Sequence, residues 1–150
     1  MERRKALKAG GGLGLLGVFA ILGLTPGSVW ASAGRAAFEA KTLDEAFGAL
    51  GVLAPENSAL IKLTAPDVAA NGAVVPVTVE SMFSGTEQIA ILVEKNPTML
   101  VASYVIPDGT EGYISTKIKM AQTSPVIALV KANGKFYRAS QEVQVTAGGC

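Results

Sequence analysis

Histidine is absent from the 150 residues of this chain, and cysteine occurs once. Without histidine there is no Ser-His-Asp or Cys-His nucleophile and no imidazole ligand for a metal. A single cysteine excludes an intramolecular disulfide, a Cys-x-x-Cys redox pair and a cysteine cluster for zinc or iron–sulfur. For covalent chemistry, the sequence therefore leaves one thiol, that of Cys150.

Charge of either sign is also scarce, because only 17% of the residues are charged whereas 49% are hydrophobic. Four of the 13 basic residues and one of the 12 acidic residues lie in the first eight positions, which leaves a net charge of −2 on the rest. A nucleic-acid-binding domain would need a basic stripe, so this class of function is excluded. The composition instead predicts one domain with a hydrophobic core.

Residues 1–33 have the pattern of an export signal. Arg3 and Arg4 precede a weakly hydrophobic, charge-free stretch that is interrupted by glycines and Pro26. The adjacent arginines predict a twin-arginine signal, and Ala31-Ser32-Ala33 predicts cleavage after Ala33. A retained membrane anchor is the alternative, but the glycines and the proline argue against it. We therefore expect a periplasmic protein that begins at Gly34.

The remainder of the chain predicts a short helix followed by a β-sandwich. Thr42 to Glu45 fits a capping box, apolar residues then recur at helical spacing, and Gly51 is placed to end the helix. Alternating apolar residues between turn signals predict strands at Ala59–Thr64, Val75–Glu80, Ile89–Val93, Leu100–Ile106, Tyr113–Met120, Val126–Ala132 and Lys135–Gln141, with a last strand running to Val145. Residues 34–145 are thus predicted to be all-β, an immunoglobulin-like antiparallel β-sandwich with a short N-terminal helix.

Three details of this pattern make sharper predictions. Pro76 has no amide hydrogen, so its strand is expected at a sheet edge or at a bulge, and the apolar edges around Val75–Val79 are candidates for a partner interface. Asn133-Gly134 predicts a type I′ hairpin turn. Lys117 and Lys119 alternate along a strand, which indicates a solvated face that could dock a partner rather than a catalytic pair.

Residues 146–150 form a C-terminal arm without a charged or bulky side chain. Ala147, Gly148 and Gly149 precede Cys150, and glycine backbones have no steric preference for one conformation. The sequence therefore predicts a flexible arm that could place the thiol in a pocket of another protein. The alternative is an incidental thiol on the frayed end of a periplasmic binding or assembly module.

The whole of the chain after the export signal is similar to SoxY, the sulfur-carrier family of the periplasmic thiosulfate-oxidising (Sox) system. The segments that carry the resemblance are Ala40–Ala46, Ala65–Asp67, Asn71–Val77, Val93–Pro97, Lys117–Met120, Val130–Tyr137 and Gly148–Cys150. Members of the family typically continue with two glycines after the cysteine, whereas this sequence stops at Cys150.

The resemblance implies a mechanism that the composition alone could not supply. Cys150 would be the site of covalent sulfur attachment, and Ala147, Gly148 and Gly149 would form a swinging arm. A c-type cytochrome would conjugate thiosulfate to the thiol, a sulfohydrolase would release sulfate, and a sulfane dehydrogenase would oxidise the remaining sulfur. The carrier would work as a heterodimer with a SoxZ-like β-sandwich subunit. It would bind no cofactor or metal and would not be an enzyme itself.

Overall fold

The computed structural model describes residues 34–150, and the predictions for the export signal, including Arg3 and Arg4, lie outside these residues. A helical segment at residues 34–39 and helix α2 (Leu43–Leu50) come first. Nine strands follow, namely β1 (Glu56–Asn57), β2 (Ile61–Thr64), β3 (Val68–Ala69), β4 (Val75–Ser81), β5 (Thr86–Val93), β6 (Leu100–Val105), β7 (Gly112–Ile118), β8 (Ser124–Ala132) and β9 (Lys135–Val145).

Helix α2 begins and ends where the capping residues predict. The Thr42 hydroxyl accepts a hydrogen bond from the Glu45 amide at 3.2 Å, and the Glu45 carboxylate accepts one from the Lys41 amide at 2.9 Å. Gly51 ends the helix in the left-handed conformation, with φ at 71°. Among residues 34–150, no helix is long and apolar enough to cross a membrane.

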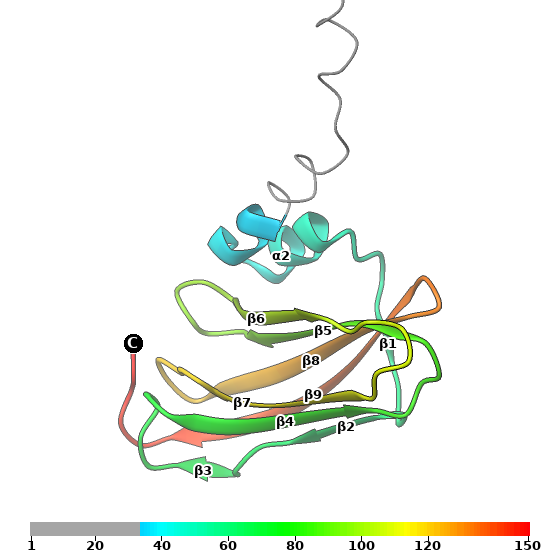
Figure 1. Ribbon diagram of the computed structural model, residues 1–150. Helices are drawn as coiled ribbons and strands as arrows, with labels where there is room; N and C mark the ends of the chain where they lie inside the picture. Colours follow the sequence, from blue (N-terminus) through cyan, green and yellow to red (C-terminus); the bar gives the residue numbers. More distant parts are fainter. Residues whose placement is uncertain (1–33) are drawn as a thin grey trace, which may run out of the picture. The chain divides into compact units, whose positions relative to one another are not determined.

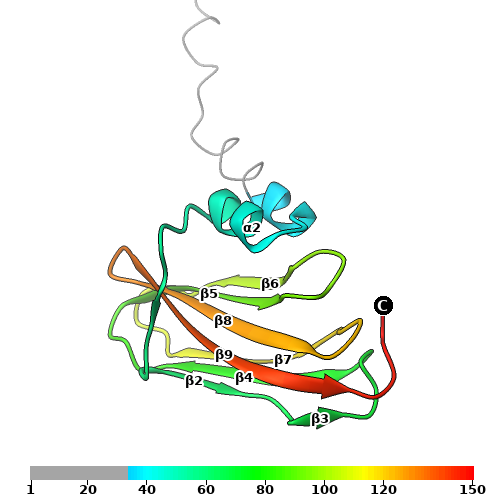
Figure 2. The same cartoon turned by 180° about the vertical axis from the view of Figure 1, so that it is seen from behind.

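The strands form two sheets that face each other, as Figures 1 and 2 show from opposite sides. The larger sheet has the order β1-β9-β8-β5-β6, with β3 also paired to β9, and the smaller one has the order β2-β4-β7. Two pairings, β1 with β9 and β3 with β9, are parallel and only two residues long, whereas the others are antiparallel. The predicted all-β sandwich with a short N-terminal helix is confirmed.

Strand β5 is buried on both sides, as its continuous apolar run predicts. Ile89, Ile91 and Val93 belong to the core that also holds the inward-facing residues of β4 and β7. Ala90 and Leu92 belong to a second core on the other side, which includes Ala37 and Ala46 of the helical segments. The helices therefore cover the outer face of the larger sheet, above β5 and β6 in Figure 1.

The prediction that Pro76 lies on an edge strand is wrong for the strand as a whole, because β4 is the central strand of the smaller sheet. The pairing of β2 with β4 ends at Thr78, so Pro76 is paired with β7 alone and its missing amide hydrogen leaves no ladder bond unmade. Val75, Val77 and Val79 are buried in the core at 0–1% exposure, so they cannot form the partner interface proposed from the sequence.

The two ends of the sandwich hold different parts of the chain. The turn between β8 and β9 lies at one end, and Asn133 and Gly134 there have φ values of 50° and 74°, which confirms the predicted turn. Strand β9 then runs the length of the sheet and delivers the C-terminus to the opposite end (Figure 2). We call the end that holds Cys150 the arm end and the other the far end.

Candidate functional site

The single thiol lies at the arm end, on the last residue of the chain. Cys150 is exposed and unpaired. It lines a cavity of about 460 Å³ together with Asn96, Lys117, Lys119 and residues of the turn between β5 and β6. No side chain of this lining is acidic. The thiol therefore lies where the charged side chains favour an anion, which is the charge state of oxidised sulfur compounds such as thiosulfate.

The start of the arm is fixed by hydrogen bonds to the loop around β3 and to the loop before β8. The amides of Gln144 and Thr146 donate to the carbonyls of Asp67 and Ala69, at 2.9 and 3.0 Å. The amide of Val145 donates to the hydroxyl of Thr123 at 2.9 Å. Because the amides of Gln144, Val145 and Thr146 are bonded in turn to different segments, the point from which the arm leaves the sheet is held from two sides.

Beyond Thr146 the arm lies against the backbone of its own domain. The amide of Gly72 donates to the Ala147 carbonyl at 2.7 Å, and the amide of Gly149 donates to the Met120 carbonyl at 2.9 Å. Gly148 passes so close to Ala121 that a Cβ atom on it would lie 2.3 Å from the Ala121 carbonyl oxygen. Flexibility of the arm remains a prediction, and the structure adds a second reason for its glycines, which is close backbone approach.

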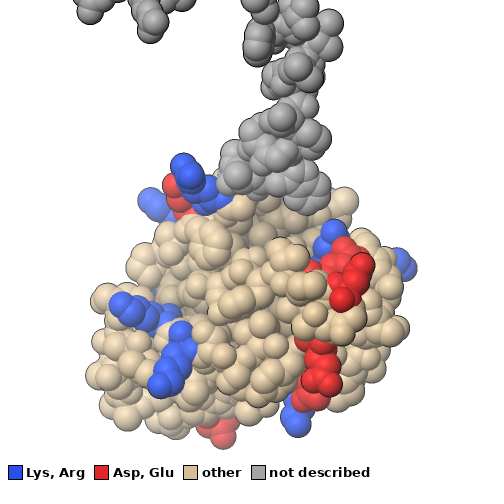
Figure 3. Space-filling model, in the orientation of Figure 1, with Lys and Arg blue, Asp and Glu red and all other residues tan. Residues whose placement is uncertain are grey.

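Asn96 joins the turn after β5 to the end of β7, and so shapes the cavity beside Cys150. Its Nδ2 donates to the Lys119 carbonyl at 2.8 Å, and its Oδ1 accepts from the Ala121 amide at 2.9 Å. Lys117 and Lys119 are exposed, in accord with the solvated face that their alternation predicts. On the face shown in Figure 3, blue side chains without red neighbours stand at the left, whereas blue and red side chains lie side by side at the right.

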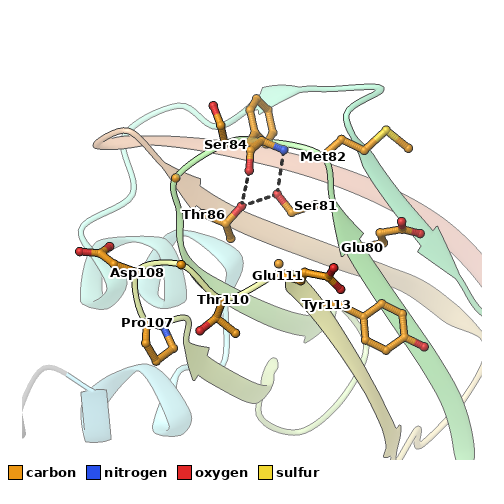
Figure 4. Close-up of a pocket in the computed structure, with 14 residues that line it drawn as sticks. Glu80, Ser81, Met82, Ser84, Thr86, Pro107, Asp108, Thr110, Glu111 and Tyr113 are labelled. Atoms are coloured by element: carbon orange, nitrogen blue, oxygen red, sulfur yellow. Dashed lines mark hydrogen bonds between the residues drawn. The ribbon is translucent and has the colours of Figure 1, made fainter.

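A second cavity, of about 480 Å³, lies at the far end between the turn after β4 and the loop before β7. Figure 4 shows the hydroxyls of Ser81 and Thr86 joined at 2.6 Å, with Thr86 also donating to the Phe83 carbonyl. The lining includes three carboxylates, those of Glu80, Asp108 and Glu111, and no basic residue. Sequence reasoning missed this cavity because its two loops are far apart in the chain and each reads as an ordinary turn.

Within residues 34–150 there is no group of three or more His, Cys, Asp or Glu side chains that could hold a metal ion. The carboxylates of the far-end cavity do not form such a group.

Comparisons with known proteins agree with this geometry. A family model described as sulfur oxidation protein SoxY matches residues 45–150. The sulfur carrier protein SoxY from Chlorobium limicola f thiosulfatophilum is 39% identical, with a TM-score of 0.64 over 70% of this chain and 96% of that one. The chain belongs to the SoxY family. Membership of this family supports a sulfur-carrier role in company with other proteins of the Sox system.

Other solved structures are similar in fold alone. The superoxide reductase (neelaredoxin) from Ignicoccus hospitalis is 18% identical, with a TM-score of 0.50 over 57% of this chain and 79% of that one. Comparison with curated protein sequences found no match. The family match extends through Cys150, so the arm and its thiol lie inside the region that the family model covers.

Proposed function

We propose that this protein carries thiosulfate-derived sulfur covalently on Cys150 and presents it to partner enzymes in the periplasm. The observation that carries the proposal is the position of the thiol. Cys150 is the one cysteine of the chain, it is exposed at the tip of the arm, and it lies beside a cavity with two lysines and no acidic side chain. This arrangement, in a chain of the SoxY family, suits a carrier of anionic sulfur groups.

The loading step is an oxidation that joins two sulfur atoms. The Cys150 thiolate forms a bond with the outer sulfur of thiosulfate, giving Cys–S–S–SO₃⁻, and two electrons pass to a c-type cytochrome partner. Water then cleaves the S–SO₃ bond on a sulfohydrolase partner, which releases sulfate and two protons and leaves Cys–S–S⁻ on the carrier. A sulfane dehydrogenase partner oxidises the sulfur that remains. The carrier supplies the thiolate in the first step, since the thiolate is the nucleophilic form.

The proposal includes the route of export and the stable partner. Arg3 and Arg4 would direct the folded chain through the twin-arginine route, with cleavage after Ala33. A SoxZ-like β-sandwich subunit would form a heterodimer with the exported chain. Lys117 and Lys119, which are exposed beside the thiol, could help to dock partners at the arm end.

Thiosulfate-dependent cytochrome reduction in a reconstituted system tests the role of the thiol. The isolated protein would be combined with the SoxZ-like subunit and the three partner enzymes. We expect Cys150→Ser to abolish the reduction, because serine cannot form the S–S bond. Ser140→Ala is the matched control, since Ser140 is exposed on β9 and lies away from the arm. If Cys150→Ser supports the wild-type rate, the carrier proposal is wrong and an incidental thiol on a binding module is the better account.

A further inference from the structure

Two backbone hydrogen bonds join the arm to the domain, and a third, within the domain, links them into one chain of bonds. The Gly72 amide donates to the Ala147 carbonyl at 2.7 Å, and the Gly72 carbonyl accepts from the Met120 amide at 2.7 Å. The Met120 carbonyl in turn accepts from the Gly149 amide at 2.9 Å. Two segments that are far apart in the sequence, around Gly72 and around Met120, thus form one surface that binds the arm.

This surface requires glycine on both sides of the contact. A Cβ atom on Gly149 would lie 1.9 Å from the Ala73 nitrogen, and one on Gly148 would lie 2.3 Å from the Ala121 carbonyl oxygen. On the domain side, a Cβ atom on Gly72 would lie 2.3 Å from the Met120 carbonyl oxygen and 2.9 Å from the Gly149 nitrogen. The obstructing atoms belong to the backbone and cannot rotate away as a side-chain tip could.

Backbone conformation does not account for these glycines. The glycines with positive φ in the described part of the chain are Gly51, Gly85, Gly109 and Gly134, so Gly72, Gly148 and Gly149 are not among them. What they share is close contact between two backbones. A need for flexibility would explain glycine in the arm, but it would not explain why the domain residue that contacts the arm, Gly72, is also a glycine.

We propose that the domain carries a docking site for its own arm, formed by the backbone of Gly72, Ala73, Met120 and Ala121. Residues 147–149 occupy it in a docked position, which holds Cys150 beside the cavity lined by Lys117 and Lys119. Partner enzymes then receive the arm in a released position, so docking competes with delivery. The docked position does not require that Cys150 carry sulfur, and the inference therefore goes beyond the proposed function.

The two positions are expected to be close in free energy. The arm contributes only two hydrogen bonds to the docking site, and each of these has a small net effect in water. Ordering two glycines opposes docking, because glycine loses more conformational freedom than any other residue. In the released position the four residues after Thr146 reach about 13–14 Å when extended, enough to enter a partner's pocket. A site that binds the arm weakly can therefore hold the arm between visits to partner enzymes and still release it readily.

Amide hydrogen exchange, measured by NMR on the isolated protein without thiosulfate or partners, tests the docking site. We expect slowed exchange at Gly72 and Gly149 in the wild type. Gly149→Ala should remove the protection at position 149 and raise the exchange rate of Gly72 by about threefold or more, since the released arm no longer presents the Ala147 carbonyl. A chain that ends at Thr146 supplies the fully released limit for the Gly72 amide.

Two controls separate docking from general destabilisation. Met120 donates its amide to Gly72 within the domain, so its protection should persist in every variant. Gly48→Ala introduces a Cβ atom with nothing within 4 Å and should leave Gly72 exchange unchanged. If the Gly72 amide of the wild type exchanges as fast as in the chain that ends at Thr146, the arm does not dock and the inference is wrong. That result would leave the sulfur-carrier function untouched, because no loading step enters the experiment.

Discussion

The two ends of the sandwich each have a cavity of similar size, but they are built from different parts of the chain. At the arm end the contacts that position the thiol are between backbone atoms, and the lining of the cavity has two lysines and no acidic side chain. At the far end, hydroxyl side chains hold the loops, and the lining has three carboxylates and no basic residue. The charged side chains of the arm end therefore favour an anion, and a Cβ atom added at Gly148 or Gly149 would collide with backbone atoms.

The largest difference between the ends should come from widening the arm. The double substitution Gly148→Val/Gly149→Val would stiffen the arm and prevent its entry into narrow partner pockets, so we expect the rate of thiosulfate-dependent cytochrome reduction to fall by at least about tenfold. Thr110→Val places the same valine side chain at the exposed lining of the far-end cavity, in exchange for a side chain of the same size, and should change the rate by less than about twofold. Equal effects of the two changes would mean that the width of the arm does not limit the rate.

Loss of side-chain hydrogen bonds should lower the free energy of unfolding equally at the two ends, but only at the arm end should it weaken docking of the arm. Asn96→Ala removes two bonds, to the Lys119 carbonyl and from the Ala121 amide, and Thr86→Val removes the hydroxyl bonds to Ser81 and Phe83. We expect each to lower the free energy of unfolding by about 1–2 kcal/mol, a fall of roughly 5–10 °C in the melting temperature by calorimetry.

The same pair of variants should separate in amide exchange. Ala121 is part of the docking site, so Asn96→Ala should also raise the exchange rate of the Gly72 amide, whereas Thr86→Val should not. Asn96→Asp is a milder variant, because the carboxylate can still accept from the Ala121 amide. A rise in Gly72 exchange in Thr86→Val as large as in Asn96→Ala would show that the two ends are not independent.

Charge at the arm end should have a smaller effect, on the rate of loading. We expect Lys117→Gln/Lys119→Gln to slow thiosulfate loading about two- to fourfold at low ionic strength, because the lysines attract the anion. The difference should shrink in about 0.5 M salt, where exposed charges are screened within about 4–5 Å. Lys62→Gln is the matched control, since Lys62 is exposed on β2 and is absent from the lining of the cavity. A slowing that persists unchanged in high salt would point to a role other than electrostatic attraction.

The smallest effect concerns Glu87 beside the hairpin turn at the far end. The Gly134 amide donates to Glu87 Oε1 at 2.8 Å and Lys131 Nζ lies 3.0 Å from Oε2, and these contacts, in that order, lower the pKa of Glu87. A carboxyl whose pKa is lowered in the folded state adds stability above its unfolded pKa, and this stability is lost as the pH falls through the folded pKa.

Glu87→Gln should therefore lower the melting temperature slightly at neutral pH, and the difference from the wild type should disappear in acid. Glu142→Gln serves as the control, because Glu142 is an exposed carboxylate on β9 that takes no part in the Lys131–Glu87 ion pair. Gly72 exchange should be the same in both variants. A larger difference in acid than at neutral pH would mean that the sign of the Glu87 shift is wrong.

Local chemistry explains which parts of the fold could be predicted from the sequence. The helix cap at Thr42, the turn at Asn133-Gly134 and the double burial of β5 each depend on a few neighbouring residues, and all three are confirmed. The position of β4 could not be predicted in this way. The sequence shows that Pro76 cannot donate a ladder bond, but it does not show that β2 ends at Thr64 and leaves Pro76 with a neighbouring strand on one side only.

The chemistry of the candidate site could be proposed from the sequence, whereas its geometry could not. The absence of histidine and of further cysteines makes Cys150 the candidate from the sequence alone. Glycine at positions 148 and 149 is compatible both with a mobile tail and with close backbone contact. Only the contacts that Gly72 and Met120 make with the arm distinguish the two. Strands β4 to β9 lie between Gly72 and the arm in the sequence, so no local sequence pattern predicts this contact.

Mass spectrometry of the intact protein, followed by fragmentation, can show directly whether Cys150 carries sulfur. The protein would be incubated with thiosulfate, the SoxZ-like subunit and the oxidising c-type cytochrome, without the sulfohydrolase. Covalent carriage on Cys150 predicts a mass increase of one thiosulfate group, located on the C-terminal fragment and removed by a reducing thiol. Cytochrome reduction by thiosulfate with Cys150 left unmodified would show that Cys150 is not the carrier group.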